Sequence, residues 1–274
     1  TNIVVNDAIT GENSKSYGNS YKSIFNFAGQ QTATSDNDVI TLNNSLTNTS
    51  TDETLGNIEV NLTKGTLKLG HYDSALLNKK YVGTLGDGVD FNVSGGKLTT
   101  QDGETHDHNL GNLKLSADLN TSIDVDLNAK TGDKLTGSTA ATATEGSKIL
   151  IDNIKVLADG TSHITKVKVA DANIKDVMDL ANDVKVVMNP SDTNSYLVVY
   201  EKDANSGNLK FGLENTLETA VQFENANKAF AMGSDIATDT DLGALTGASL
   251  SISGNGHTID GVGFGGMTIA DNQT

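Results

Sequence analysis

Short runs of alternating apolar and polar residues, each broken by Gly, Asn or Asp, most constrain the fold of this chain. The runs are most regular over residues 57–127, where they recur at intervals of roughly ten residues. Alternation with a period of two is typical of a β-strand that buries one face. The pattern predicts an all-β protein. The apolar positions of these runs are Ile58, Val60, Leu62, Leu67, Leu69, Val89, Phe91, Val93, Leu98, Leu113, Leu115, Ile123, Val125 and Leu127.

Regularly spaced short strands occur in antiparallel sandwiches and in parallel β-solenoids, whose coils stack on one another. A sandwich predicts two-residue hairpin loops of the Asn-Gly or Asp-Gly type. The breaks here vary in length and often read Gly-Gly or Gly-Asn-Leu, which suits the corners of a solenoid better. We therefore predict a parallel β-helix. In such a fold, Ile, Val and Leu of successive coils form internal columns, with Asn and Thr ladders at the corners.

The composition agrees with a fold of many turns and excludes several kinds of site. Thr, Asn, Gly, Asp and Ser supply 136 of the 274 residues, and there is a single Pro. These are the residue types that tight turns between short strands require. The chain has no Cys and no Arg, which rules out disulfides, thiol nucleophiles and guanidinium clamps. The net charge of −16 makes nucleic acids and anionic membranes unfavourable partners.

Changes in composition and in the pattern of apolar residues along the chain predict three segments. Residues 1–135 are predicted as β-solenoid coils, residues 136–212 as a connector, and residues 213–274 as opening coils of a β-helix. The connector is expected to hold a small α/β or hairpin insertion around 150–212, with the clearest hairpin between 196–200 and 209–211. Apolar residues at helical spacing favour a short helix capped by Asp171, although the run Val184-Lys185-Val186-Val187 favours a strand. The stripe is Ile174, Val177, Met178, Ala181 and Val184.

The last sixty residues carry the most specific pattern. A short Leu-x-x-Ala-Val segment at 217–221 precedes the string Leu-x-Ile-x-Gly-Asn-Gly-His-Thr-Ile-Asp-Gly at 250–261. This pattern resembles the opening coils of right-handed parallel β-helices of the pectin-lyase-like group, as found in bacterial autotransporter passengers and surface adhesins. The resemblance covers residues 216–274 and is compositional over 57–135. It implies a secreted, elongated protein, and some members of the group are polysaccharide lyases or hydrolases.

The two ends of the chain have the same strand texture. The segment 267–274 stops where a coil is expected to continue, and the segment 1–6 is an isolated strand. We expect a circularly permuted unit, which is either one repeat of a tandem array or a unit that stacks on a neighbouring copy. A boundary placed within a longer solenoid explains the same ends. Head-to-tail self-association would use Ile3 and Val5 at one end and Met267 and Ile269 at the other.

Catalysis is not expected. A β-helix lyase or glycosidase needs carboxylates together with a cation that stabilises developing charge. In pectate lyases and polygalacturonases that cation includes Arg, which this chain lacks. The pair Gly256-His257 and the nearby Asp260 are superficially similar to a catalytic Gly-His pair, but they belong to the corner string. We therefore predict no catalytic residue and no cofactor.

Two segments contain residue types that bind metal ions. His106 and His108 would share one face of a strand, but the flanking Gly103 and Asn109 favour an exposed loop and an incidental His-x-His. The segment 203–207, Asp-Ala-Asn-Ser-Gly, is similar to the first half of a calcium loop. No Glu stands at the required distance beyond it, so a hairpin turn is the favoured interpretation. No metal site is predicted.

The sequence thus predicts a non-enzymatic, extracellular structural protein, a bacterial β-solenoid unit of a surface fibre or adhesin. Its expected partner is a second copy of itself, and a host-surface or glycan ligand is considered as well. Two alternatives stay open. One is a polysaccharide-binding or polysaccharide-cleaving β-helix, and the other is an appendage protein of flagellin or phage-tail type.

Overall fold

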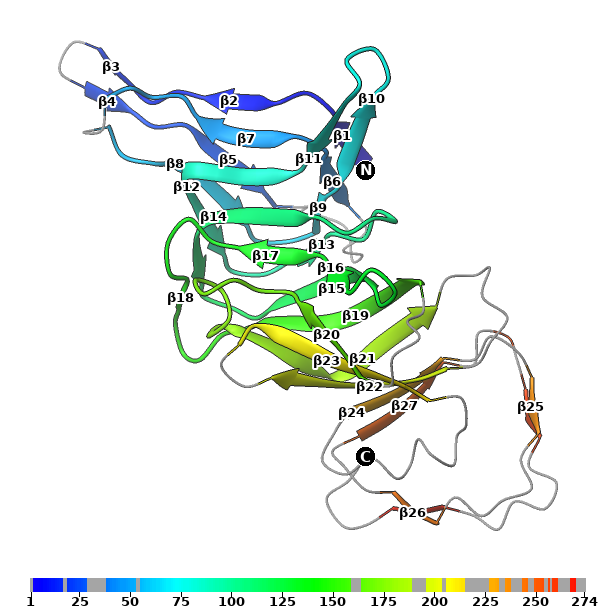
Figure 1. The fold of residues 1–274 in the computed structure, drawn as a ribbon. Coiled ribbons are helices and arrows are strands. Elements are labelled where there is room, and N and C mark those ends of the chain that lie inside the picture. The colour runs from blue at the N-terminus through cyan, green and yellow to red at the C-terminus, as the bar shows by residue number, and fades with distance from the viewer. Residues whose placement is uncertain are drawn as a thin grey trace.

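The regular secondary structure of the described residues is almost all β-strand, most of it in parallel sheets (Figure 1). The computed structural model describes residues 2–16, 19–28, 38–52, 55–158, 164–188, 196–203 and 206–214. It also describes 227–231, 235–237, 243–245, 249–253, 256, 258–260 and 267–269. Among these residues, no helix has the length and apolar character needed to cross a membrane. The predicted all-β solenoid class is confirmed.

The first sheet runs through successive coils in chain order. Each strand pairs in parallel with the equivalent strand of the next coil. Lys97 pairs with Asn120, a step of 23 residues, and Asn2 pairs with Val39, a step of 37. Coils of unequal length therefore still stack strand on strand, with register shifts within the β15–β19 and β19–β21 pairings. The strands are β1 (Asn2–Val5), β6 (Val39–Leu42), β9 (Thr66–Leu69), β13 (Lys97–Thr99), β15 (Leu119–Asp126), β19 (Ile149–Ala158) and β21 (Met178–Met188).

The second sheet is also parallel and has two overlapping rows. Two long strands, β12 (Thr84–Val93) and β14 (Asp107–Leu115), take part in both rows. Each coil crosses the first sheet and then passes along the second. The other strands of the first row are β2 (Ile9–Gly11), β7 (Ser45–Asn48) and β17 (Lys134–Thr136). Those of the second row are β5 (Ile24–Phe27), β8 (Ile58–Leu62) and β18 (Thr142–Ala143).

Buried apolar side chains of successive coils stack into columns between the two sheets. In the first sheet one column joins Leu67, Leu98 and Ile151 through Thr121. In the second sheet Phe91 stacks between neighbours of the flanking coils. All the alternating apolar residues predicted over 57–127 are buried, each no more than 2% exposed. The predicted columns are confirmed.

Asparagine side chains also form ladders across coils. Asn61 Nδ2 donates to Asn26 Oδ1 at 2.9 Å, and Asn92 Nδ2 donates to Asn61 Oδ1 at 2.8 Å. This ladder runs along strands β5, β8 and β12, not along a corner as predicted. At a corner, Asn43 Nδ2 donates to Asn6 Oδ1 at 2.8 Å. In the strand ladder the Asn61 amide both donates and accepts, which suits a stack of equivalent coils.

Hairpins interrupt the coils at their corners. β3 (Ser14–Ser16) pairs with β4 (Asn19–Tyr21), and β10 (His71–Ser74) pairs with β11 (Lys79–Val82), both antiparallel. The second hairpin projects from the stack between β9 and β12 (Figure 1). Its tip exposes Leu76 and Leu77. A short strand, β16 (Thr131–Gly132), folds back on β15 at the corner of a later coil.

The segment predicted to hold a helix forms a turn and a strand instead. Asp171 Oδ1 accepts hydrogen bonds from the backbone N–H groups of Asn173 and Ile174, so the predicted cap residue closes a corner turn. The chain then continues as β21, in parallel register with β19. The helix prediction is therefore wrong. Pairing with the preceding coil overrides the helical spacing, and buried Val184 and Val186 alternate as strand residues do.

Strands β19 and β21, which lie in the segment predicted as a connector, continue the first sheet. A five-stranded mixed sheet follows, and its β22–β23 hairpin is the one predicted from sequence. Its strands are β20 (Ile164–Lys168), β23 (Asn208–Glu214), β22 (Tyr196–Asp203), β24 (Asn227–Ala231) and β27 (Ser249–Ser253). Two further parallel pairs join β25 (Ile236–Ala237) to β28 (Ile259–Asp260) and β26 (Gly243–Leu245) to β29 (Met267–Ile269).

A polar cluster on the second sheet leads to a pH-dependent prediction. Asp90 accepts hydrogen bonds from Asn57 Nδ2 at 2.7 Å, Asn112 Nδ2 at 3.0 Å and Lys114 Nζ at 2.9 Å. Burial alone would raise the pKa of Asp90, but the hydrogen bonds from Asn57, Lys114 and Asn112 outweigh it and hold that pKa below its usual value. The ionised form is therefore favoured by folding.

Asp90→Asn is expected to lower the free energy of unfolding by about 1–2 kcal/mol at neutral pH. Because folding depresses the pKa of Asp90, its contribution is fully present above the ordinary aspartate pKa near 4 and is lost as the pH falls through the folded-state value. Urea unfolding of both proteins from pH 7 to pH 3 checks this. A difference that grows as the pH falls would contradict it.

Candidate metal centre

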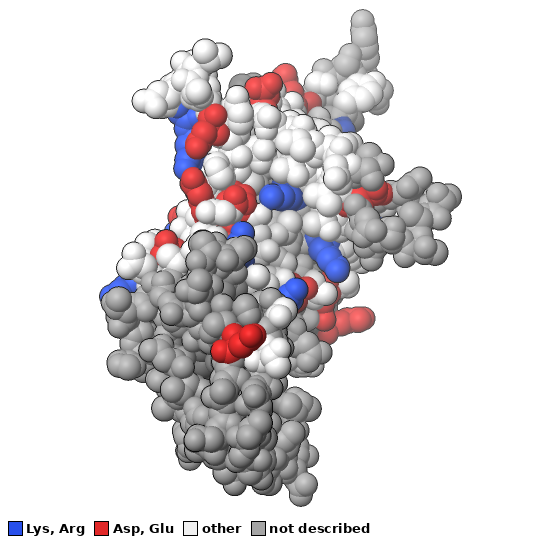
Figure 2. All heavy atoms as spheres, turned by 90° about the vertical axis from the view of Figure 1, so that its right-hand side faces the viewer, with Lys and Arg blue, Asp and Glu red and all other residues white. Residues whose placement is uncertain are grey.

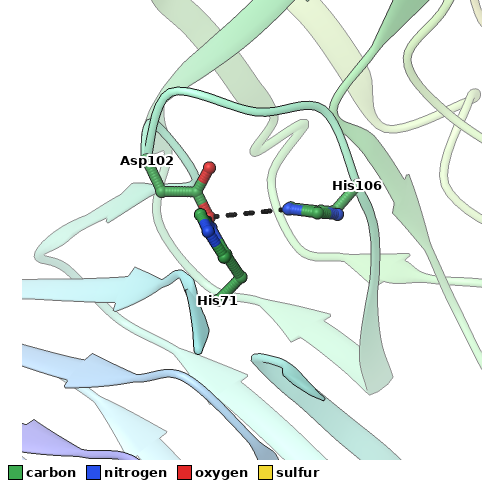
Figure 3. A group of neighbouring side chains, drawn as sticks. All are labelled: His71, Asp102 and His106. Carbon is green, nitrogen blue, oxygen red and sulfur yellow. Dashed lines mark hydrogen bonds and ion pairs between the residues drawn. The ribbon is translucent and has the colours of Figure 1, made fainter. Parts of the chain in front are cut away.

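Two segments far apart in the sequence meet at one corner of the solenoid (Figure 3). His71 is the first residue of β10, at the base of the projecting hairpin. Asp102, Glu104 and His106 lie in the loop that leads from β13 to β14 in the next coil. Because corners of successive coils stack, the hairpin base and this loop are neighbours.

Three side chains of this corner point toward one another. His71 Nδ1 lies 2.8 Å from Asp102 Oδ2, and His106 Nε2 lies 4.0 Å from the same oxygen (Figure 3). The imidazole ring centroids are 5.1 Å apart. One ligand atom from each of the three residues lies within 4.8 Å of the other two. The side chains of His71, Asp102 and His106 are only 18%, 6% and 11% exposed.

A second carboxylate borders the same space from the solvent side. Glu104 Oε2 lies 3.5 Å from His106 Nε2, and Glu104 Oε1 lies 3.8 Å from His71 Nε2. Lys80 of β11 forms an ion pair with Glu104. The hydrogen bond from Lys80 holds the pKa of Glu104 below its usual value, with help from His71 and His106. Glu104 is therefore ionised at neutral pH and faces both imidazoles.

Two buried carboxylates hold the loop from below. Asp124 Oδ2 accepts the backbone N–H groups of Asp102 at 2.9 Å and Gly103 at 2.7 Å. Asp133 Oδ1 accepts the backbone N–H of His106 at 3.0 Å. Burial raises the pKa of Asp124 to about 6, and the charge of Asp133 adds to this. The loop backbone is thus fixed by side chains of the following coil.

His106 is in the form that binds metal ions. Burial lowers the pKa of His106, an effect that Asp102 opposes and that His108 and His71 reinforce. Its ring is therefore neutral at pH 7. Its Nε2 atom is buried and has no hydrogen-bond partner within the described part of the chain. Two imidazoles and a carboxylate form a donor set suited to Zn²⁺ and similar divalent ions.

The structure corrects the interpretation of His106 and His108 as an exposed loop. His108 is fully buried on β14, and its Nδ1 lies 2.9 Å from the carbonyl oxygen of Gly83. His106 is nearly buried and turns toward His71 instead of pairing with His108 at a common site. The loop ends where β14 begins at Asp107, so the pairing of β14 with β12 and β17 draws His108 inside.

The other candidate residues lie apart from this corner. Gly207, with a φ of 67°, closes the β22–β23 hairpin, as the favoured hairpin interpretation of 203–207 expects, while residues 204–205 lie outside the described residues. His257 also lies outside them, and Asp260 is on β28. The absence of catalysis and of calcium binding stays a prediction.

The residues predicted for self-association lie on two separate sheets. Ile3 and Val5 are on β1, where Ile3 is 49% exposed and Val5 packs partly against the core. Met267 and Ile269 are on β29, which pairs in parallel with β26. β1 lies at the top of the stack in Figure 1 and β26 at the bottom, so one copy does not bring the two pairs together.

The sequence reasoning missed His71 and Asp102. His71 lies in the irregular segment between Gly70 and Val82, which contains no period that predicts its position in the stack. The one available signal was the density of His, Asp and Glu at 102–108. That signal marks one half of the cluster and gives no indication of its partner.

The chain matches no protein-family model, no curated protein and no solved structure. The parallel sheets agree with a β-helix, and the resemblance to pectin-lyase-like and autotransporter proteins stays a prediction.

Proposed function

We propose that this protein is a structural β-solenoid unit of an extracellular bacterial fibre or adhesin, and that copies associate head to tail through the ends of the solenoid. The observation that carries the proposal is an open end of the stack. Within the described residues, β1 pairs with β6 alone and β2 pairs with β7 alone. Strands with one free edge accept a further strand.

Within the described residues, no further coil covers the apolar columns at this end. Ile3 continues the column of Ile40 and Leu67, yet it is 49% exposed. Ile9 likewise extends the column of Leu46 and is only partly buried. A coil of a second copy would cover both residues and extend both sheets. We assign the contact on that second copy to β29, with Met267 and Ile269. Such a heterologous contact generates filaments when it does not close.

The surface supports a role in which shape matters more than a charged ligand. Figure 2 shows acidic side chains and lysines interspersed on one face, with broad areas of uncharged atoms between them. Asn, Thr and Ser are abundant, Arg and Cys are absent, and the net charge is −16. This composition suits exposure outside the cell, and it keeps a long assembly soluble.

Replacing Ile3 by lysine tests the open end. Because a buried lysine would oppose coil addition, Ile3→Lys is expected to raise the concentration at which assemblies form at least about tenfold. Sedimentation velocity and negative-stain microscopy over a concentration series measure this. Leu76→Lys is the matched control, since Leu76 is 98% exposed at the hairpin tip. It is expected to assemble like the parent.

Dispersed monomers of the parent at high concentration would contradict the association, as would equal effects of the two lysine variants.

The non-enzymatic part of the proposal has its own test. Incubation with polygalacturonate and related glycans is expected to yield no cleavage products. Turnover would instead support the alternative of a polysaccharide-cleaving β-helix.

A further inference from the structure

We propose that His71, Asp102 and His106 bind one divalent transition metal ion of the Zn²⁺ class, which ties the β10–β11 hairpin to the corner of the next coil. The three residues come from two coils, and their ligand atoms lie within 4.8 Å of one another. This inference is independent of self-association, because the cluster lies on the side of the solenoid and not on β1 or β29.

The two distances from Asp102 fit an ion with modest rearrangement, and the ligand atoms of the two histidines lie no more than 4.8 Å apart. Zn²⁺ binds imidazole nitrogen and carboxylate oxygen at about 2.0–2.2 Å in a tetrahedron, which places its ligand atoms about 3.3 Å apart. The two separations from Asp102 Oδ2, 2.8 Å to His71 Nδ1 and 4.0 Å to His106 Nε2, lie on either side of that value. Small side-chain rotations of His71 and His106 would equalise them. Water would complete the coordination.

The unpartnered nitrogen of His106 is the observation that a simple ion pair does not explain. A hydrogen bond between His71 and Asp102 accounts for those two residues on its own. It leaves His106 Nε2 buried without a hydrogen-bond partner among the described residues, which is costly for a polar atom. A metal ion in contact with Asp102 Oδ2 would satisfy this nitrogen and balance the charge of the carboxylate.

The charges around the cluster favour a cation. Asp102 and Glu104 face the two imidazoles, and Asp73 lies close enough to group with His71 and Glu104. Lys80 is the cation paired with Glu104 and Asp73 at this position. A doubly charged ion on the inner side would meet three carboxylates and one lysine, a net attraction.

Glu104 is placed to accept a hydrogen bond from the tautomer of His71 that would bind a metal ion through Nδ1. In the metal-free corner, His71 Nδ1 lies at hydrogen-bond distance from Asp102 Oδ2. To bind a metal ion through Nδ1, the neutral ring must carry its proton on Nε2. That atom faces Glu104 Oε1 at 3.8 Å, so the carboxylate would have to move slightly closer to accept its N–H. A carboxylate that accepts the second N–H of a ligating histidine is a usual partner in metal sites.

Isothermal titration of the metal-free full chain with ZnCl₂ is expected to show one site. Saturation at about 100 times the dissociation constant is expected to raise the melting temperature by about 5 °C or more. His106→Ala and Asp102→Asn are each expected to weaken binding at least about 10- to 100-fold. Asp107→Asn is the matched control, because this carboxylate neighbours His106 in sequence but is exposed and paired with Lys134. It is expected to bind like the parent.

A measurement on the unaltered chain covers the case in which a variant fails to fold. Histidine nitrogen resonances are expected to shift on Zn²⁺ addition at His71 Nδ1 and His106 Nε2, while those of His108 change little. Co²⁺ in place of Zn²⁺ is expected to give the intense visible bands of a tetrahedral site. Absence of stoichiometric binding, or Zn²⁺ binding that shifts neither His71 nor His106, would overturn the proposal.

Discussion

Replacing Phe91 by alanine is expected to lower the free energy of unfolding by about 3–5 kcal/mol. Phe91 is fully buried on β12 and pairs with Val60 of the preceding coil and Leu113 of the following coil. Truncation to alanine leaves a cavity between the side chains of Val60 and Leu113, so packing is lost in three successive coils. In a solenoid each coil contacts mainly its neighbours, so the loss weakens the stack on both sides of β12.

Urea unfolding followed by circular dichroism measures this effect. The control is Leu76→Ala, which removes a similar apolar side chain at the exposed hairpin tip. It is expected to change stability by no more than about 0.5 kcal/mol. Equal unfolding midpoints of the Phe91 variant and the control would show that the columns of buried side chains do not hold the fold together.

The second large effect is expected for Asp133→Ala, at about 3–5 kcal/mol. Asp133 is fully buried. Its Oδ2 accepts Thr100 Oγ1 at 2.6 Å and the backbone N–H of Asp124 at 2.8 Å, and its Oδ1 accepts the backbone N–H of His106. Alanine would remove the acceptor of the two backbone N–H groups, and each carries a desolvation cost. The Thr100 hydroxyl would keep only its longer contact, at 3.2 Å, with the carbonyl oxygen of Ser122.

The change at Asp133 is also expected to loosen the loop that holds Asp102 and His106. Hydrogen exchange of residues 101–106 is expected to accelerate in Asp133→Ala and to stay unchanged in the exposed control Asp107→Asn. Unaltered protection of this loop, together with a loss of stability below about 1 kcal/mol, would contradict the assigned role of the buried carboxylate.

The repeating part of the fold could be predicted because its chemistry is local. An apolar residue at every second position, followed by Gly, Asn or Asp, is enough to identify strands such as β8 and β12 and their buried faces. The Asn ladder was also expected as a type, although it runs along strands and not only along corners. The ladder forms where asparagines of successive coils pair with one another. Which residues pair is decided only when the coils stack.

The helix at 174–184 and the exposed loop at 106–108 were predicted wrongly for one physical reason. In both segments, pairing with a strand of another coil decides the conformation, and no local pattern reports it. The cluster of His71, Asp102 and His106 was not predicted for the same reason, because it forms only when two coils stack. The step between paired strands of the first sheet varies from 23 to 37 residues, so the sequence separation of His71 from Asp102 does not show that they stack.

The proposed self-association and the proposed metal site involve different parts of the stack. The ends are proposed to join copies, and the hairpin corner is proposed to be stiffened by an ion. If both hold, removal of metal is expected to free the hairpin amides to exchange while assemblies persist. If the protein does not assemble, the metal titration still tests the proposed metal site by itself.

X-ray diffraction from aligned assemblies tests the central claim most directly. Coils that stack end to end place the strands of the two stacked sheets across the long axis, and neighbouring strands lie about 4.8 Å apart along it. The account predicts a strong reflection at about 4.8 Å on the meridian. The same spacing on the equator would mean that strands run along the axis, and this result would contradict head-to-tail stacking of the solenoid.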